Sequence, residues 1–247
     1  MTRIAAMGGG GFSMEPRNPR LDRWLLSLAG RKRPRVLFVP TASGDAPDYI
    51  ARFHRAFAKH DCEPSHLQLF NRTVRKLRDF VLRQHIVYVG GGSTANMLAI
   101  WRLHGLDAIL REAWENGTLL CGVSAGANCW FESSLTDSFG RPLRALHDGL
   151  ALLPGSFCPH YDGERDRRAA YRHLVANGEL PAGWAAEDSV AVLFENGNAA
   201  DIVASRRGKS AFRIEPMRSS SRAAEHRYSA TPLVITTKSR SPASSTS

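Results

Sequence analysis

The stretch Leu119-Leu120-Cys121-Gly122-Val123-Ser124-Ala125-Gly126-Ala127-Asn128 decides the fold class of this 247-residue chain. Its first five residues suit a strand that is buried on both faces, and the residues after Ser124 suit the start of a helix. Gly-x-Ser-x-Gly between a strand and a helix is the nucleophile-elbow pattern, in which a tight, strained turn exposes the serine hydroxyl. The pattern predicts a reactive serine, Ser124, at the carboxyl end of a strand in an α/β sheet.

The rest of the chain supports an α/β fold, because short apolar runs alternate with amphipathic stretches of helical length. The predicted strands are residues 4–7, 35–40, 65–70, 85–90 and 118–123, and the predicted helices are residues 19–29, 46–60, 73–83, 94–104 and 106–116. This alternation is typical of βαβ crossovers. It predicts a mainly parallel, doubly wound sheet with flanking helices.

The pattern changes after about residue 185, where the predicted strands follow one another closely. Residues 189–194, 201–204 and 211–215 read as strands, and Asn196-Gly197 is a strong hairpin signal. We expect one α/β domain over residues 1–216, which ends in this β-hairpin region. Residues 217–247 are predicted to be a basic, serine-rich and loosely ordered tail.

The net charge of +10 is concentrated at the end of the chain. Residues 205–247 hold nine Lys and Arg against two Glu, a net of +7, which leaves +3 for the other 204 residues. Basicity of the tail alone, with little aromatic interleaving, does not favour a nucleic-acid partner. The sequence also lacks an apolar run of the ~18 residues needed to span a membrane. Four cysteines without paired spacing and the absence of a signal peptide predict a cytoplasmic protein.

A serine nucleophile needs a base, and two histidines lie outside the helical patterns, the strands and the tail: His147 and His160. His160 lies in Cys158-Pro159-His160-Tyr161-Asp162, an irregular segment that follows a Pro-Gly turn. A loop that follows a strand can place a base next to the serine of a nucleophile elbow. The acid that orients the base has four candidates, and spacing alone does not choose among them: Asp137, Asp162, Glu187 and Asp188.

Two glycine loops accompany the elbow. Gly90-Gly91-Gly92-Ser93 is expected to supply an oxyanion amide, from Gly91 or Gly92, beside the Ala125 amide. Read as a dinucleotide fingerprint it is weak, because the acid expected on a following strand is missing. Gly8–Gly11 has no Walker lysine after it, and no His or Cys spacing suits a metal. We expect neither a cofactor nor a metal ion.

Several of these segments together resemble the peptidase E, or aspartyl dipeptidase, family, with cyanophycinase as a more distant relative. The resemblance rests on VGGGST (89–94), GVSAGAN (122–128), Asp148-Gly149-Leu150 with Leu152-Leu153-Pro154, and CPHYD (158–162), and it extends from about residue 2 to 215. It implies a class I glutamine amidotransferase-like fold with a serine at the position of the amidotransferase cysteine. It also implies that Ser124 is the nucleophile and His160 the general base. The family's strand-end carboxylate falls on Asp188, which we prefer as the acid, with Asp137 as the alternative.

The resemblance implies a serine-type dipeptidase that acts on small peptides, with Asp-X dipeptides as one candidate class. The family's preference for aspartate relies on basic residues after the histidine segment, which here are Arg165, Arg167 and Arg168. A solvated face of a helix over residues 165–177 is the alternative interpretation of these arginines. Oxyanion donors are expected from Gly92 and Ala125, although the family's GGN is Gly91-Gly92-Ser93 here.

Other functions on the same scaffold stay open at this point. A cyanophycinase-like or other amide hydrolase is one alternative, and a binding protein that has lost the chemistry is another. The chain order Ser, His, Asp disfavours an α/β-hydrolase esterase, in which the order is Ser, Asp, His. The sequence leaves the oligomeric state open, a homodimer included.

Overall fold

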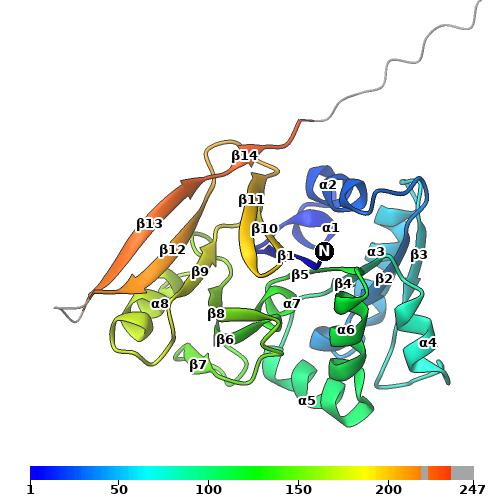
Figure 1. Cartoon of the computed structure of the whole chain (residues 1–247), viewed down its shortest axis with the longest axis horizontal. Helices are drawn as coiled ribbons and strands as arrows, with labels where there is room; N and C mark the ends of the chain where they lie inside the picture. Colours follow the sequence, from blue (N-terminus) through cyan, green and yellow to red (C-terminus); the bar gives the residue numbers. More distant parts are fainter. Residues whose placement is uncertain (218–221, 235–247) are drawn as a thin grey trace, which may run out of the picture.

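The computed structural model describes residues 1–217 and 222–234, which form two β-sheets with helices around them (Figure 1). The first sheet has eight strands in the order β14-β11-β10-β1-β5-β4-β2-β3. Their bounds are Arg3–Met7 (β1), Arg35–Val39 (β2), Glu63–His66 (β3), Ile86–Val89 (β4), Leu119–Val123 (β5), Val190–Glu195 (β10), Asn198–Ala204 (β11) and Thr231–Pro232 (β14). Each of the five predicted parallel strands overlaps a strand of this sheet, and the five are neighbours; the strand predicted over 65–70 instead begins at Glu63 and ends at His66.

Strands β1, β5, β4, β2 and β3 run parallel to one another, whereas β10 pairs with β1 and with β11 in antiparallel fashion. The carboxyl ends of parallel strands meet at one edge of a sheet, and ligands bind there in open α/β folds. The loops after β1, β4 and β5 therefore converge at one edge. These loops begin at Gly8, Gly90 and Ser124.

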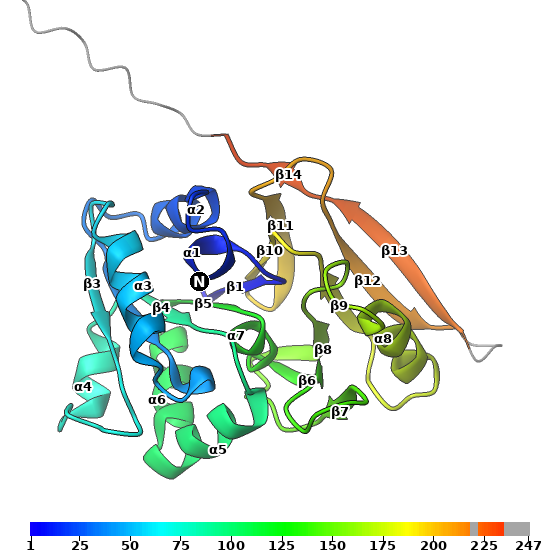
Figure 2. The same ribbon diagram turned by 180° about the vertical axis from the view of Figure 1, so that it is seen from behind.

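Helices cover both faces of the first sheet, as Figure 2 shows from behind. Alternate residues of β2 explain why, since Val36 and Phe38 belong to one buried apolar cluster and Leu37 and Val39 to the other. The first cluster includes residues of α2 and α3, and the second includes residues of α4, α5 and α6. The helix bounds are Gly11–Met14 (α1), Arg20–Leu28 (α2), Pro47–Phe57 (α3), Leu77–Leu82 (α4), Thr94–His104 (α5), Leu106–Glu115 (α6), Ala125–Asn128 (α7) and Arg167–Ala176 (α8), with a 3-10 turn at Thr41–Ser43 (η1).

A second, six-stranded sheet was not expected from the sequence. Its order is β13-β12-β9-β8-β6-β7, with parallel pairs only between β9, β8 and β6. The strands are Phe131–Thr136 (β6), Arg144–Leu146 (β7), Leu153–Cys158 (β8), Gly183–Ala186 (β9), Ser210–Pro216 (β12) and Ala223–Ser229 (β13). This sheet leads into the site, because β8 ends two residues before His160 and β9 ends two residues before Asp188.

The predicted boundary at residue 216 falls inside a hairpin. Strand β13 pairs with β12 from Ser210–Ser229 to Pro216–Ala223, so residues 223–229 of the predicted loose tail are ordered. Glu225 of β13 also accepts a hydrogen bond from Arg168 of α8, a long-range contact that composition does not reveal. The remaining predicted tail residues, 218–221 and 235–247, lie outside the described residues. Within residues 1–217 and 222–234, no helix is long and apolar enough to cross a membrane.

Candidate active site

Ser124 occupies the strained turn that its sequence predicted. Its backbone lies at φ 58° and ψ −118°, an unfavourable conformation for a residue with a side chain. The two glycines of the pattern are required by close approach, since a Cβ at Gly122 would lie 2.0 Å from the Gly126 carbonyl oxygen. A Cβ at Gly126 would lie 2.3 Å from the carbonyl oxygen of Val89. The turn leaves Ser124 half-buried at the carboxyl edge of the sheet.

Three consecutive carbonyl groups at the end of β1 hold the three segments of the site. The Ser124 N–H donates to the Met7 carbonyl at 3.2 Å, and the His160 N–H donates to the Gly8 carbonyl at 3.2 Å. The Ser189 N–H donates to the Gly9 carbonyl at 3.0 Å. Residues 7–9 thus bring the elbow, the histidine loop and the segment that carries Asp188 to one corner of the molecule.

His160 and Asp188 contact each other directly. His160 Nδ1 lies 2.7 Å from Asp188 Oδ1, and the His160 side chain is buried. This hydrogen bond is the main reason why the pKa of Asp188 lies below its usual value, although burial opposes the shift. With Nδ1 bound to the acid, Nε2 is the ring nitrogen that remains for proton transfer.

The other predicted acids have different partners. Asp137 Oδ2 lies 3.9 Å from Arg167, and Glu187 accepts a hydrogen bond from the Ser210 N–H at 2.9 Å. Asp162 accepts from the backbone N–H of Asp188 at 2.8 Å and so helps to hold that residue. Among the four candidates, the acid within hydrogen-bond distance of His160 is Asp188.

Two glycines to which the sequence analysis gave no role in the site enclose the Asp188 carboxylate. A Cβ at Gly9 would lie 2.1 Å from Asp188 Oδ1, and a Cβ at Gly163 would lie 2.1 Å from Asp188 Oδ2. Both positions must therefore lack a Cβ for the Asp188 carboxylate to lie beside His160. Gly9 belongs to the run Gly8–Gly11 after β1, for which the sequence analysis only excluded a Walker motif.

The predicted oxyanion residues lie in the loops around Ser124. Gly91 lies nearest, since a Cβ there would be 3.3 Å from Ser124 Cβ, and its N–H donates to the Tyr49 hydroxyl at 3.2 Å. Gly92 has φ 141° and packs against Ala42, whose carbonyl oxygen a Cβ would approach to 2.1 Å. Ala125 is the first residue of α7, where a backbone N–H has no partner within the helix.

The three predicted substrate-binding arginines have three different environments. The Arg165 side chain is 91% exposed, whereas Arg168 donates to Glu225 and stacks over the rings of Tyr161 and Phe212. The Arg167 side chain is only 3% exposed and contacts Glu164 Oε2 through both Nε and a terminal nitrogen, at 2.8 and 2.6 Å. Only Arg167 therefore lies in the network around His160.

Glu164 is a site residue that the sequence analysis did not identify. Its Oε1 lies 3.9 Å from His160 Nε2, the ring nitrogen that Asp188 leaves free, and its side chain is 36% exposed. Glu164 follows His160 by four residues, but the segment is irregular, so that spacing gave no signal of contact.

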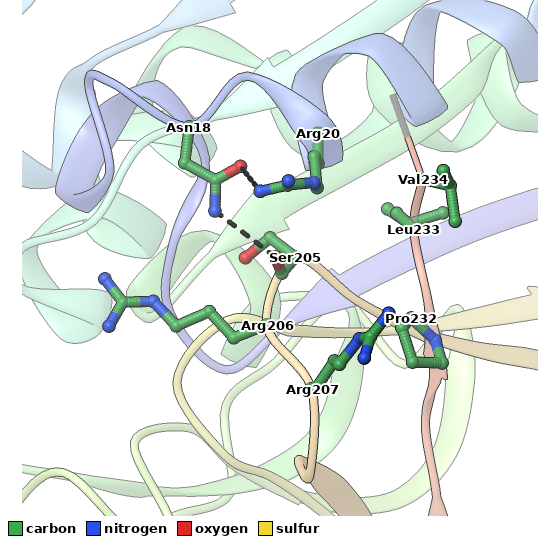
Figure 3. A pocket seen from close by; sticks show the side chains of 8 residues that line it. All are labelled: Asn18, Arg20, Ser205, Arg206, Arg207, Pro232, Leu233 and Val234. Carbon is green, nitrogen blue, oxygen red and sulfur yellow. Dashed lines mark hydrogen bonds between the residues drawn. The ribbon is translucent and has the colours of Figure 1, made fainter. Parts of the chain in front are cut away.

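A separate cavity lies on another part of the surface, between α2 and the loop after β11. It has a volume of about 870 Å³ and includes Asn18, Arg20, Arg206 and Leu233 in its lining (Figure 3). Ser205 of its lining is linked to the segment after Asp188, because the Ser205 N–H donates to the Ser189 carbonyl at 2.9 Å and both serine hydroxyls donate to the buried Glu15 carboxylate. As for metals, no group of three or more His, Cys, Asp or Glu in the described part of the chain is arranged to hold an ion.

Comparison with known proteins identifies the family. The sequence model of peptidase family S51 matches residues 4–202, which is most of the chain and includes Ser124, His160 and Asp188. The chain belongs to peptidase family S51. It is 50% identical over 235 residues to the uncharacterized peptidase YgaJ of Bacillus subtilis, an alignment that covers 95% of this chain and 98% of that protein. This S51 chain is therefore a peptidase, as the resemblance implied.

Two further likenesses agree with this assignment. Peptidase E of Haemophilus influenzae is 34% identical to the S51 chain over 86 residues, which are 34% of this chain and 39% of that protein. A crystal structure of a peptidase from an acI-B1 actinobacterium superimposes with a TM-score of 0.69 at 16% identity and covers 93% of this chain and 95% of its own. The structural likeness confirms the predicted α/β fold of class I glutamine amidotransferase type.

Proposed function

We propose that this S51 peptidase hydrolyses short peptides through an acyl-enzyme on Ser124, with His160 as the base and Asp188 as the acid. The observation that carries the proposal is the 2.7 Å contact between His160 Nδ1 and Asp188 Oδ1. It fixes the tautomer of a neutral imidazole, because Nδ1 must carry the proton that Asp188 accepts. His160 Nε2 is then unprotonated and available to Ser124.

The proposed reaction has two halves. In the first, Ser124 Oγ attacks the scissile carbonyl carbon while His160 Nε2 takes the hydroxyl proton. His160 then gives this proton to the leaving amine, the peptide C–N bond breaks, and the first residue stays on Ser124 as an ester. In the second half, His160 activates a water molecule that hydrolyses the ester and restores the free serine.

The Ala125 and Gly92 amides are the proposed donors to the oxyanion of the tetrahedral intermediate. Ala125 directly follows the nucleophile, and its N–H is unused within α7. The Gly91 N–H is already bonded to Tyr49, which favours Gly92 as the second donor. Such a donor is worth about 3 kcal/mol of barrier in serine peptidases.

Asp-X dipeptides are one candidate substrate class in this proposal. An aspartate side chain at the first position would need a cation, and Arg167 is the predicted arginine that is linked to His160 through Glu164. Its guanidinium already contacts Glu164 at 2.6 Å, so a substrate carboxylate would have to compete with Glu164 for it. The serine mechanism does not depend on whether the enzyme prefers an aspartate side chain at the first position of the substrate.

The proposal is tested by the hydrolysis of a dipeptide panel by the wild type and by Ser124→Ala, with Asp-Leu, Ala-Leu, Glu-Leu and Met-Leu as substrates. Ser27→Ala, on the exposed side of α2, is the matched control. We expect the wild type and the control to release leucine from at least one substrate, and Ser124→Ala to release none while it keeps its fold. Full activity of folded Ser124→Ala would refute the serine mechanism.

A further inference from the structure

The glycine loop after β4 supplies the second proposed oxyanion donor and is held on both sides of it. The Gly91 N–H donates to the Tyr49 hydroxyl of α3 at 3.2 Å, and the Ser93 N–H donates to the Ala42 carbonyl of η1 at 2.8 Å. Gly92 lies between these two contacts, and within the described residues its own N–H has no hydrogen-bond partner. The loop is thus fixed around the amide that is proposed to bind the oxyanion.

This loop connects Tyr49 to the nucleophile. A Cβ at Gly91 would lie 3.3 Å from Ser124 Cβ and 3.8 Å from Ser124 Oγ. The residue whose N–H is bonded to Tyr49 therefore lies directly against the serine. The Tyr49 ring also packs closely on the loop, because a Cβ at Gly90 would lie 2.8 Å from Cε1 of the ring. A change at Tyr49 should consequently move the amides of the loop relative to Ser124 Oγ.

The Tyr49 hydroxyl has a second partner in the segment that follows β1. It lies 2.6 Å from Ser13 Oγ of α1. Because the hydroxyl oxygen accepts from the Gly91 N–H, its own proton can be donated to Ser13 Oγ. One hydroxyl group therefore ties the oxyanion loop to the segment whose carbonyl groups, at residues 8 and 9, hold the segments of the base and the acid.

Packing alone does not require this hydroxyl. The Tyr49 ring lies against Phe12 and Phe38, with centroids 5.6 and 5.0 Å apart, and a phenylalanine would make the same contacts. Burial raises the pKa of Tyr49 above its usual value, so the hydroxyl keeps its proton at neutral pH. A buried hydroxyl is costly unless it is hydrogen-bonded. The reason for a tyrosine therefore lies in its two partners, Gly91 and Ser13.

We infer that Tyr49 is a positioning residue for the oxyanion loop: its hydroxyl holds the Gly91 N–H and thereby leaves the Gly92 N–H to bind the oxyanion. The inference rests on the proposed function, since it needs an oxyanion that forms when Ser124 attacks a carbonyl group. Loss of one oxyanion donor lowers kcat by about 10²- to 10³-fold in serine peptidases. A donor that is displaced but still present should cost less.

Tyr49→Phe tests the inference, because it removes the hydroxyl and keeps the ring. On the best substrate of the dipeptide panel, kcat should fall by about 10- to 100-fold while KM stays within about twofold, since the loop acts on the tetrahedral intermediate and not on the bound peptide. Tyr171→Phe is the matched control, because the Tyr171 hydroxyl is also buried and lies 2.7 Å from Ser156 Oγ, outside the site. It should lose similar stability in urea unfolding but keep the wild-type kcat.

A transition-state analogue separates positioning from a general loss of structure. The α-aminoboronic acid that corresponds to the first residue of that substrate forms a tetrahedral adduct with a serine hydroxyl. In Tyr49→Phe, the Ki of this compound should rise by about the factor by which kcat falls. Tyr171→Phe should bind it as tightly as the wild type does.

Ser13→Ala provides a second variant on the same path. It removes the acceptor of the Tyr49 hydroxyl proton, so kcat should fall in the same direction but by less. The double variant should be no slower than Tyr49→Phe alone, because Ser13 acts on the loop through the Tyr49 hydroxyl. Additive losses in the double variant would contradict this connection.

Labelling of Ser124 by a neutral fluorophosphonate separates the failure of this inference from the failure of the proposed function. No Ser124-dependent labelling of the wild type would reject the proposed function itself. With labelling intact, three results in folded Tyr49→Phe would overturn the inference alone: a wild-type kcat, a loss confined to KM, and a loss of kcat equal to that of Tyr171→Phe. A higher kcat would also overturn it, since the released Gly91 N–H would then be the better donor.

Discussion

The Nδ1 atom of His160 lies 2.7 Å from Oδ1 of Asp188, although the two residues are 28 positions apart and follow different strands of the second sheet. The relationship depends on the first sheet, since His160 and Ser189 bond to consecutive carbonyl groups after β1. The end of β1 thereby sets the distance between base and acid. Ser124, bonded to Met7, is anchored to the same segment.

Removal of the acid should lower the rate without unfolding the protein. Asp188→Asn keeps the size of the side chain but no longer favours the imidazole tautomer with a proton on Nδ1. We expect kcat to fall by up to about 10⁴-fold. Asp137→Asn, the same change at the alternative acid, should cost far less, because Asp137 contacts Arg167 and not His160. Equal losses in the two variants would contradict the assignment of Asp188.

Gly9→Ala should impair the site through a single methyl group. The new Cβ would lie 2.1 Å from Asp188 Oδ1, so the carboxylate would have to move away from His160. We expect kcat to fall by at least about tenfold, since small misplacements of catalytic groups are costly. Gly117→Ala is the control, because a Cβ there meets nothing within 4 Å; its φ of 90° should cost stability, but kcat should stay unchanged. Wild-type kcat in Gly9→Ala would show that this packing does not position the acid.

Arg168 should matter for stability and not for substrate binding. Its partner Glu225 lies on β13 and also contacts Arg172 at 3.4 Å, so Arg168→Gln should cost about 1 kcal/mol or less. Arg167→Gln should cost more, about 2 kcal/mol, because the buried guanidinium loses its hydrogen bonds to Glu164, whose carboxylate is partly solvated. Urea unfolding measures both values. A large rise in KM for Asp-Leu in Arg168→Gln would instead support an aspartate pocket at that residue.

Asp22 should make stability depend on pH. Burial on α2 raises the pKa of this carboxyl from 3.8 to about 7, and the nearby Glu15 adds to the shift. Between these two values the folded state binds more protons than the unfolded state. The free energy of unfolding should therefore fall as pH rises from about 4 to 7 and should change little from this group above pH 7.

Asp22→Asn tests this expectation, because it removes the titration but keeps the shape. Its stability relative to the wild type should be more favourable at pH 8 than at pH 5 in urea unfolding. Asp61→Asn, on the surface beside Arg33, should give the same difference from the wild type at both pH values. A pH-independent effect of Asp22→Asn would mean that Asp22 is not protonated in the folded state near neutral pH.

Much of the first sheet could be predicted, since its strands are continuous apolar runs with buried residues on both faces. The nucleophile elbow could also be predicted, because the close approach of Gly122 and Gly126 to neighbouring carbonyl groups makes glycine necessary there. The second sheet was not predicted. Strands such as Phe131-Glu132-Ser133-Ser134-Leu135-Thr136 and Leu153-Pro154-Gly155-Ser156-Phe157-Cys158 are partly polar and show no clear alternation.

The choice among the four acids and the position of Glu164 needed the three-dimensional arrangement. Asp162, Glu187 and Asp188 lie in similar irregular segments, and only the contacts after β1 and β9 direct Asp188 toward His160. Glu164 lies in a turn that begins at His160, a residue with φ 52°, where neither helical nor strand periodicity applies. The contact between the Glu164 side chain and His160 Nε2 therefore could not be predicted from the sequence spacing.

The most direct test of the serine mechanism is covalent trapping of the nucleophile. The wild type, Ser124→Ala and His160→Ala are treated with a neutral fluorophosphonate, and intact-mass measurement and peptide mapping locate the adduct. We predict one adduct per chain in the wild type, on Ser124 in the peptide that contains residues 119–128. We predict none in Ser124→Ala and much slower labelling in His160→Ala. A folded wild type without an adduct on Ser124, or labelling that persists in Ser124→Ala at the wild-type rate, would contradict the serine mechanism.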